Sequence, residues 1–144
     1  MTHHRSKTIA TWLALALGTF GAHRFYLRGR RDALAWLHAI PTLIGLFGAW
    51  RLRVNGIDDW LPWLLLPLLG LMIAQAALCA ILYGLTPDEQ WAARFHQPVQ
   101  ETAWAPVLGV IFALLIGGGV LMGTIAFSVQ HFFEWELASP TALN

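Results

Sequence analysis

Charged residues divide the chain into four long apolar stretches. These stretches run from Thr8 to Ala22, from Ala33 to Trp50, from Trp60 to Pro87 and from Thr102 to Phe133. A helix needs about 20 apolar residues to cross about 30 Å of hydrocarbon, and the third and fourth stretches exceed this length without a single charge. The pattern predicts an all-α, polytopic integral membrane protein in which four transmembrane helices form two helical hairpins.

The first stretch is short for a membrane helix. At 1.5 Å per residue it covers only about 22 Å, so we expect it to borrow from His23 to Leu27, to thin the bilayer or to stop short of the far interface. A cleaved secretory signal is an alternative, because Arg5 and Lys7 precede this apolar run. In the second stretch, Pro41 predicts a kink rather than a break, since neighbouring groups can satisfy the freed carbonyl.

Small residues recur every four positions in several of these stretches. In lipid, such a spacing lets two helix backbones approach closely, which predicts a compact bundle. A competing interpretation is that Gly and Ala are simply common in membrane helices. The helix-packing positions expected on this basis are Ala10, Ala14, Gly18 and Ala22 in the first stretch, Ala76, Ala80 and Gly84 in the third, and Gly109, Ala113, Gly117, Gly119 and Gly123 in the fourth.

The stretches and the polar segments between them predict the domain organisation. We expect a cytoplasmic or external tail over 1–7, a first hairpin over 8–50, a loop over 51–60, a second hairpin over 61–133 and a C-terminal tail over 134–144. Within the second hairpin, the Thr86-Pro87-Asp88-Glu89 sequence predicts a capping box. The short helix that it starts, at about 87–96, either lies flat on the membrane or forms an ordinary connecting turn.

Composition agrees with a membrane protein and excludes several other classes. Hydrophobic residues make up 57% of the chain and charged residues 12%, against about 45–50% and about 25% in soluble domains. A net charge of +1 gives no reason to expect a nucleic-acid partner. The six histidines are scattered without ligand spacing, and no nucleophile–base arrangement is present. We therefore expect no metal, no cofactor and no enzymatic activity.

One compact motif lies between the first two stretches. It reads Gly18-Thr19-Phe20-Gly21-Ala22-His23-Arg24-Phe25-Tyr26-Leu27, and the basic sequence Arg28-Gly29-Arg30-Arg31 follows it. Together with the preceding Ser6-Lys7 and the Ala/Leu-rich helix, this motif resembles the TM2 domain family over about residues 5–50. The family pattern is approximately Lys-Ser-Lys, an apolar helix and then Gly-x-x-Gly-x-His-Arg-Phe-Tyr-Leu-Gly. Arg28 stands where the family usually has glycine.

The resemblance implies two membrane helices joined by a short loop, in the prokaryotic form of the domain, so we expect a multi-pass protein of the prokaryotic cytoplasmic (inner) membrane. The basic cluster in this short loop favours a cytoplasmic location for it. Physically, the motif is either a boundary anchor or a receptor face for anionic lipid headgroups or an acidic partner. The candidate lipid- or partner-binding residues are His23, Arg24, Phe25, Tyr26, Arg28, Arg30 and Arg31.

Two polar residues lie inside predicted spans. His38 is a functional-site candidate because ionisable groups are costly in a membrane, although a hydrogen bond between helices explains His38 and Gln75 equally well. The sequence as a whole predicts a non-enzymatic interaction or scaffold module that contacts membrane lipids, and either a membrane protein partner or a second copy of itself. The alternative is a homo-oligomeric pore or small transporter, with His38 and Gln75 facing a shared lumen.

Overall fold

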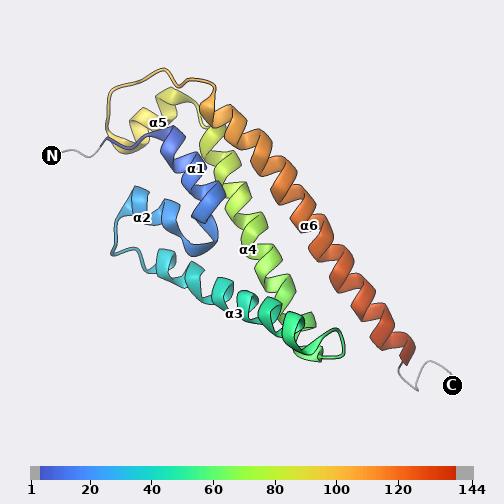
Figure 1. Ribbon diagram of the computed structural model, residues 1–144. Helices are drawn as coiled ribbons and strands as arrows, with labels where there is room; N and C mark the ends of the chain where they lie inside the picture. Colours follow the sequence, from blue (N-terminus) through green and yellow to red (C-terminus); the bar gives the residue numbers. More distant parts are fainter. Residues whose placement is uncertain (1–3, 139–144) are drawn as a thin grey trace.

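The computed structural model describes residues 4–138, and helices account for most of them (Figure 1). These residues contain no strand, so the expected all-α fold is confirmed. In chain order the elements are α1 (Lys7–Leu17), the 3-10 helix η1 (Gly18–Phe20), α2 (Ala22–Arg28), α3 (Ala33–Asn55), α4 (Trp60–Leu85), α5 (Asp88–Phe95) and α6 (Ala105–Ala138). Helices α3 and α6 run past the ends of their apolar stretches, which shortens the loop expected at 51–60 and the tail expected at 134–144.

Helix α4 is the centre of the bundle, because α1, α3 and α6 all pack on it (Figure 1). Acidic side chains cap the N-termini of two of the long helices, α3 and α4. The Asp59 carboxylate accepts a hydrogen bond of 3.1 Å from the Leu61 N–H at the start of α4, and Asp32 accepts one of 3.0 Å from the Leu34 N–H at the start of α3. Each satisfies a backbone donor that the helix leaves unpaired.

Helices α1 and α3 run in the same direction along α4 and cover successive parts of it. At the end of α1, Gly18 lies against Ala76 of α4, whereas the earlier residue Thr11 lies near Gly84. In α3, Gly48 lies against Leu65 and Gly45 against Leu69. For both helices the partner number in α4 falls as their own number rises, so both are antiparallel to α4. The first two apolar stretches therefore do not lie side by side as an antiparallel pair.

A glycine turn reverses the chain after α1. Gly21 has a φ of 76°, in the left-handed region that favours glycine. A Cβ at this position would lie 2.5 Å from the carbonyl oxygen of Ala35, so the turn packs directly on the backbone of α3. From this turn α2 runs back toward the end of the bundle at which α1 begins, and a short loop then leads into α3 (Figure 1).

Most of the small residues expected at helix contacts are at helix contacts. Ala10, Ala14, Ala76, Ala80 and Ala113 are at most 2% exposed, and Gly18, Gly84, Gly109 and Gly117 each approach a neighbouring helix closely. Ala22 is only partly buried. The expectation for Gly119 and Gly123 is wrong within this chain, because a Cβ on either would meet nothing within 4 Å. Gly123 borders a hollow between α4 and α6 instead of making a close helix contact.

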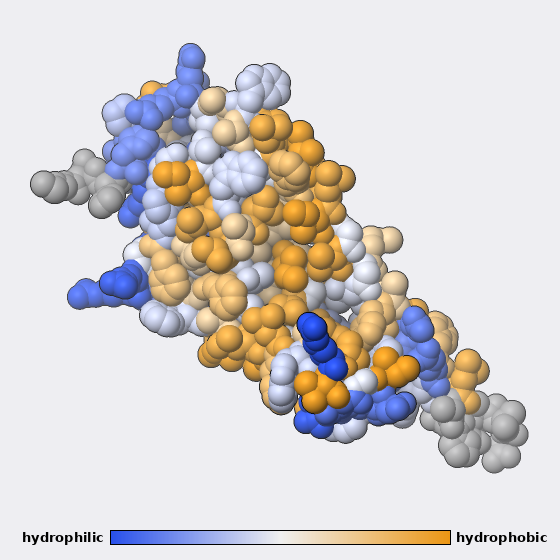
Figure 2. Space-filling model, in the orientation of Figure 1, coloured by the Kyte–Doolittle hydropathy of each residue, from blue (hydrophilic) through white to orange (hydrophobic). Residues whose placement is uncertain are grey.

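Three helices within residues 4–138 are long and apolar enough to cross a membrane, namely α3, α4 and α6. The segment Lys7–Phe20 is shorter, so only three of the four expected spans are confirmed. Its helix stops short because the Gly21 turn ends it before it can borrow from His23 to Leu27. Apolar side chains such as Leu43, Leu64 and Leu115 are more than half exposed, and Figure 2 shows hydrophobic surface between hydrophilic ends. The chain is a membrane protein.

Candidate functional site

The motif residues lie on the short helix α2 rather than in a loop, and they separate into an inward and an outward group. His23 and Leu27 are 1% and 7% exposed, respectively. They lie four positions apart, which places them on one face of the helix, and this face packs toward α1 and α4. His23 is therefore an interior residue and not part of an exposed receptor face.

His23 lies in a group of polar side chains where α2, α3 and α4 meet. Its ring centroid is 5.7 Å from that of Tyr83 in α4 and 6.0 Å from that of His38 in α3. The His23 Nδ1 atom is buried without a hydrogen-bond partner among the described residues. A Cβ on Gly18 would lie 3.4 Å from this nitrogen, so the glycine of the motif makes room for the histidine of the motif.

His38 of α3 and Gln75 of α4 contact each other. His38 Nδ1 lies 2.6 Å from the carbonyl oxygen of Leu34, which can only accept, so Nδ1 carries the proton. The Nε2 atom of His38 then accepts a hydrogen bond of 3.2 Å from the Gln75 amide, whose Nε2 also lies 3.5 Å from the Cys79 Sγ. Gln75 Oε1 is buried and has no partner among residues 4–138. The predicted hydrogen bond between helices is present.

Arg24 is held by an acidic residue that follows the basic loop. Its Nε donates a 3.0 Å hydrogen bond to Asp32, while Arg28 lies at 4.0 Å from the same carboxylate. Partial desolvation raises the pKa of the Asp32 carboxyl, but hydrogen bonds from Arg24 and from the Leu34 N–H outweigh it, so this pKa lies below its usual value. The ion pair closes the loop between α2 and α3.

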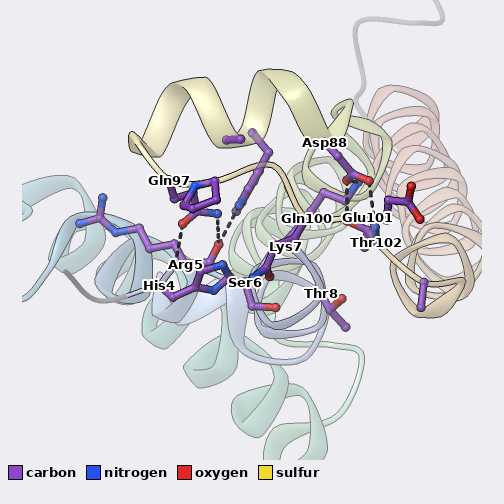
Figure 3. Close-up of a pocket in the computed structure, with 14 residues that line it drawn as sticks. His4, Arg5, Ser6, Lys7, Thr8, Asp88, Gln97, Gln100, Glu101 and Thr102 are labelled. Carbon is purple, nitrogen blue, oxygen red and sulfur yellow. Dashed lines mark hydrogen bonds and ion pairs between the residues drawn. The ribbon is translucent and has the colours of Figure 1, made fainter. Parts of the chain in front are cut away.

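Tyr26 ties the hairpin to the N-terminal segment, which is well anchored from Arg5 onward. The Ser6 N–H donates a hydrogen bond of 2.8 Å to the Tyr26 hydroxyl. The Arg5 N–H donates to the Gln97 side chain at 3.1 Å, and the Arg5 carbonyl accepts from Gln97 at 3.2 Å (Figure 3). The same carbonyl also accepts a hydrogen bond of 2.8 Å from the Trp91 indole. Residues 5–7 are therefore part of the fold and not a loose tail.

Lys7 connects the same segment to the loop that precedes α6 (Figure 3). Its ammonium donates to Asp88 at 2.5 Å and to the Thr86 carbonyl at 3.0 Å. The Asp88 carboxylate also accepts from the Thr102 N–H at 2.9 Å and from the Thr102 hydroxyl. The hydrogen bond from Lys7, followed by those from Thr102, lowers the pKa of Asp88 to about 2. One carboxylate thus joins α1, α5 and the α5–α6 loop.

The outward group forms a basic edge, which we define as Arg28, Arg30 and Arg31. All three are exposed or partly exposed. Trp36 stands beside this edge and is 64% exposed; its indole N–H donates a 3.2 Å hydrogen bond to the Arg30 carbonyl. The Phe25 ring packs edge-on against Trp36, with centroids 5.2 Å apart. Cations next to an exposed tryptophan are typical of the boundary between headgroups and hydrocarbon.

Sequence reasoning missed the residues that hold the motif in place. Asp32 directly precedes an apolar run, which is an N-cap signal that could have identified it. Asp88 was expected only as part of the predicted capping-box sequence at the start of its own helix. Trp91 and Gln97 carry no local signal for their role, because their partner Arg5 lies 86 and 92 positions away in the chain.

These features define the class: a helical membrane protein in which a short folded hairpin, clamped at both ends, precedes three long apolar helices. Residues 3–53 match the family model described as the TM2 domain. The match covers the N-terminal part of the chain, where the motif indicated it, and ends within α3. Comparisons with the curated proteins and with the solved structures find no match for this chain.

Proposed function

We propose that this protein is a non-enzymatic membrane module that binds anionic lipid through the basic edge of its TM2 domain. The observation that supports this most directly is which of the motif cations are paired with a carboxylate and which are accessible. Arg24 is already neutralised by Asp32, whereas Arg28, Arg30 and Arg31 remain accessible beside Trp36. Cations near an anionic membrane surface each contribute about 1 kcal/mol of attraction. An edge of three can therefore select anionic lipid.

The same proposal includes a membrane topology. With three crossings, by α3, α4 and α6, the α1–η1–α2 hairpin enters the membrane and returns to the side on which it started. The direction of α1 and α3 along α4 supports this arrangement, and so does α2, which brings the basic edge back toward the end at which α1 begins. Irregular backbone is tolerated at membrane depth where protein buries it, and Gly21 packs on α3.

This topology changes the distribution of positive charge. With four spans, the Lys and Arg residues divide into four on one side and five on the other. With three crossings, one side carries seven, Arg5, Lys7, Arg24, Arg28, Arg30, Arg31 and Arg94, and the other carries two, Arg51 and Arg53. Cytoplasmic segments are enriched in Lys and Arg. The basic edge would then face the cytoplasm from a multi-pass protein of a prokaryotic cytoplasmic membrane, where the inner leaflet supplies anionic lipid.

Lipid retention tests the proposed function. The chain is purified from nanodiscs that contain phosphatidylcholine and phosphatidylglycerol, and the lipids that remain bound are counted by native mass spectrometry. The combined variant Arg28→Gln, Arg30→Gln, Arg31→Gln should lose its preference for phosphatidylglycerol. The control variant Arg53→Gln, at the opposite end, should keep that preference. A combined variant that retains phosphatidylglycerol as the natural sequence does would refute the proposal.

Transport is the second candidate function, and the polar group around His38 favours it. His23 Nδ1 and Gln75 Oε1 are buried without partners among the described residues, and an intramembrane histidine can carry a proton. Proton flux in proteoliposomes that disappears in His38→Ala would support a transporter or homo-oligomeric pore. Absence of flux in the natural protein would leave the lipid-binding module. Binding to a membrane protein partner, or to a second copy of this chain, stays a prediction.

A further inference from the structure

A hollow of about 370 Å³ lies between the N-terminal segment and α2. This volume falls within the roughly 300–1,000 Å³ of small-molecule pockets. Three of its residues can carry positive charge, two are aromatic and one is a glycine: His4, Arg5, Arg28, Phe25, Tyr26 and Gly29. The hollow thus combines cations from two segments, about 20 positions apart, that the fold brings together.

The Arg5 side chain is held in place before any ligand binds. The Arg5 backbone makes hydrogen bonds with Trp91 and Gln97, and the next residue bonds to Tyr26, which itself lines the hollow. The Arg5 guanidinium carbon also lies 5.1 Å from the centroid of the Phe95 ring. A side chain fixed in this way loses little conformational freedom on binding, which favours affinity.

Positive charge in the hollow is only partly compensated. Asp32 is 4.0 Å from Arg28, but it makes its closer contact, at 3.0 Å, with Arg24. The lining residues include no acidic side chain. Two arginines that line one hollow suit a phosphate group, because the planar fork of each arginine side chain can bond two phosphate oxygens.

Apolar surface continues directly from the hollow along α3. Phe25 lines the hollow and packs on Trp36. Further along α3, Leu37 and Ile40 are 55% and 54% exposed. A ligand whose phosphate sits between the arginines would therefore lay an apolar tail on lipid-facing side chains. This geometry distinguishes a phospholipid from a free phosphate ion.

We propose that this hollow is a binding site for the headgroup phosphate of one anionic phospholipid, with Arg5 and Arg28 as its two anion ligands. The inference rests on the proposed function, because it uses the same lipid class and shares Arg28. It adds Arg5, which lies outside the basic edge, and it assigns Arg30 and Arg31 to general attraction rather than to this site.

Titration of the delipidated full chain with phosphatidylglycerol in neutral detergent tests the site, with native mass spectrometry as the readout for the first bound lipid. Arg5→Gln and Arg28→Gln should each raise its dissociation constant about fivefold, which corresponds to the loss of one favourable cation. Arg30→Gln and Arg31→Gln, matched in charge, should change it by less than about twofold. Arg5→Lys, which keeps the charge without the fork, should fall between Arg5→Gln and the natural sequence.

Several outcomes separate this site from the broader proposal. Normal binding by Arg5→Gln, with anionic preference still lost in the combined variant of the basic edge, would overturn the site and leave the proposed function intact. Normal binding by Arg5→Gln, together with retained anionic preference in the combined variant, would overturn both the site and the proposed function. Inorganic phosphate that binds as tightly as phosphatidylglycerol would overturn the assignment to phospholipid, because the apolar tail would then contribute nothing, and it would mean that the hollow binds free phosphate. Because Arg5 contributes to the fold through its backbone, unchanged thermal unfolding of Arg5→Gln verifies that the variant reports binding.

Discussion

The backbone N–H of Ser6 donates a 2.8 Å hydrogen bond to the hydroxyl of Tyr26, which joins the start of α1 to the end of α2. Two separated parts of the TM2 pattern, the Ser-Lys start and the Phe-Tyr pair, therefore meet in space. The contact holds the α1–α2 hairpin closed at the end opposite its glycine turn. A phenylalanine at position 26 could not accept this hydrogen bond.

Tyr26→Phe removes this hydroxyl and leaves the Ser6 N–H without its partner. We expect a loss of about 1 kcal/mol in the free energy of unfolding, read as a lower midpoint in thermal unfolding followed by tryptophan fluorescence in detergent. The matched control is Tyr83→Phe, because the described residues provide no hydrogen bond to the Tyr83 hydroxyl while its ring packs on Trp91. Equal midpoints for the two variants would contradict this role for Tyr26.

Asp88 gives the fold an acid-sensitive contact. Its carboxyl is paired with Lys7, and its pKa is lowered to about 2 from an ordinary value of 3.8. Because the folded value is the lower one, the stabilisation is fully present above pH 3.8 and is lost as the pH falls toward about 2. Thermal midpoints of the natural sequence should fall across this window, and those of Asp88→Asn should fall less. Thermal midpoints that fall equally with pH in the natural sequence and in Asp88→Asn would argue against a stabilising contact between Lys7 and Asp88.

Gly21→Ala should damage the hairpin turn. The substitution places a Cβ at positive φ, and this atom would meet the Ala35 carbonyl oxygen at 2.5 Å. The backbone strain alone costs about 1–2 kcal/mol, so the folded yield in detergent should drop sharply. Gly118→Ala is the control, since a Cβ there has nothing within 4 Å, and alanine in a helix interior should be neutral or stabilising. A normal yield of Gly21→Ala would show that the turn can relax.

Arg24→Ala should destabilise the protein more than Arg30→Ala. Arg24 is paired with Asp32, and both side chains are at most 18% exposed, so its removal leaves a poorly solvated carboxylate. We expect a lower thermal midpoint and a lower folded yield in detergent for Arg24→Ala than for Arg30→Ala. Restoration of stability by Asp32→Asn in the Arg24→Ala background would identify the unpaired carboxylate as the cause. Equal folded yield of the two arginine variants would count against it.

Single-cysteine labelling distinguishes three crossings from four. In a Cys79→Ala background, three crossings place His4→Cys and Gln100→Cys on one side and Ile57→Cys on the other. Four spans would place His4→Cys and Ile57→Cys on the same side. A membrane-impermeant maleimide, added to intact cells and to inverted vesicles, reads the side of each residue. Co-labelling of positions 4 and 57 from one side would exclude the re-entrant hairpin.

Local patterns predicted much of this fold because their causes are local. Ala10, Ala14 and Ala113 are buried as the four-residue spacing indicated, since spacing along one helix fixes which residues share a face. The helix at about 87–96 was also found, as Asp88–Phe95. Its predicted capping box was wrong: the Thr86 hydroxyl bonds back to the Leu82 carbonyl at 2.6 Å, so Thr86 closes α4 instead of starting α5.

The remainder depended on contacts between distant residues. Hydropathy identifies an apolar segment but not the depth at which a turn such as Gly21 ends it. The register that sets Gly45 against Leu69 and Gly18 against Ala76 decides the direction of α1 relative to α3, and no single-helix pattern contains it. For the candidate site, the sequence named the cations of the motif, but only the fold shows that Asp32 neutralises Arg24 and that Arg5 joins Arg28 at one hollow.

The glycine contacts with α4 make the N-terminal segment dependent on a later part of the chain. Gly18, Gly45 and Gly48 all press against a helix that lies beyond residues 3–53, the part that matches the TM2 domain. Expressed without α4, the segment would enter a bilayer with its glycine-lined face uncovered. In lipid, small residues on such a face favour close packing against another helix. Such a fragment should therefore associate with itself or with foreign helices. In this chain, the segment that matches the TM2 domain therefore packs on a supporting helix, α4, that lies outside the match.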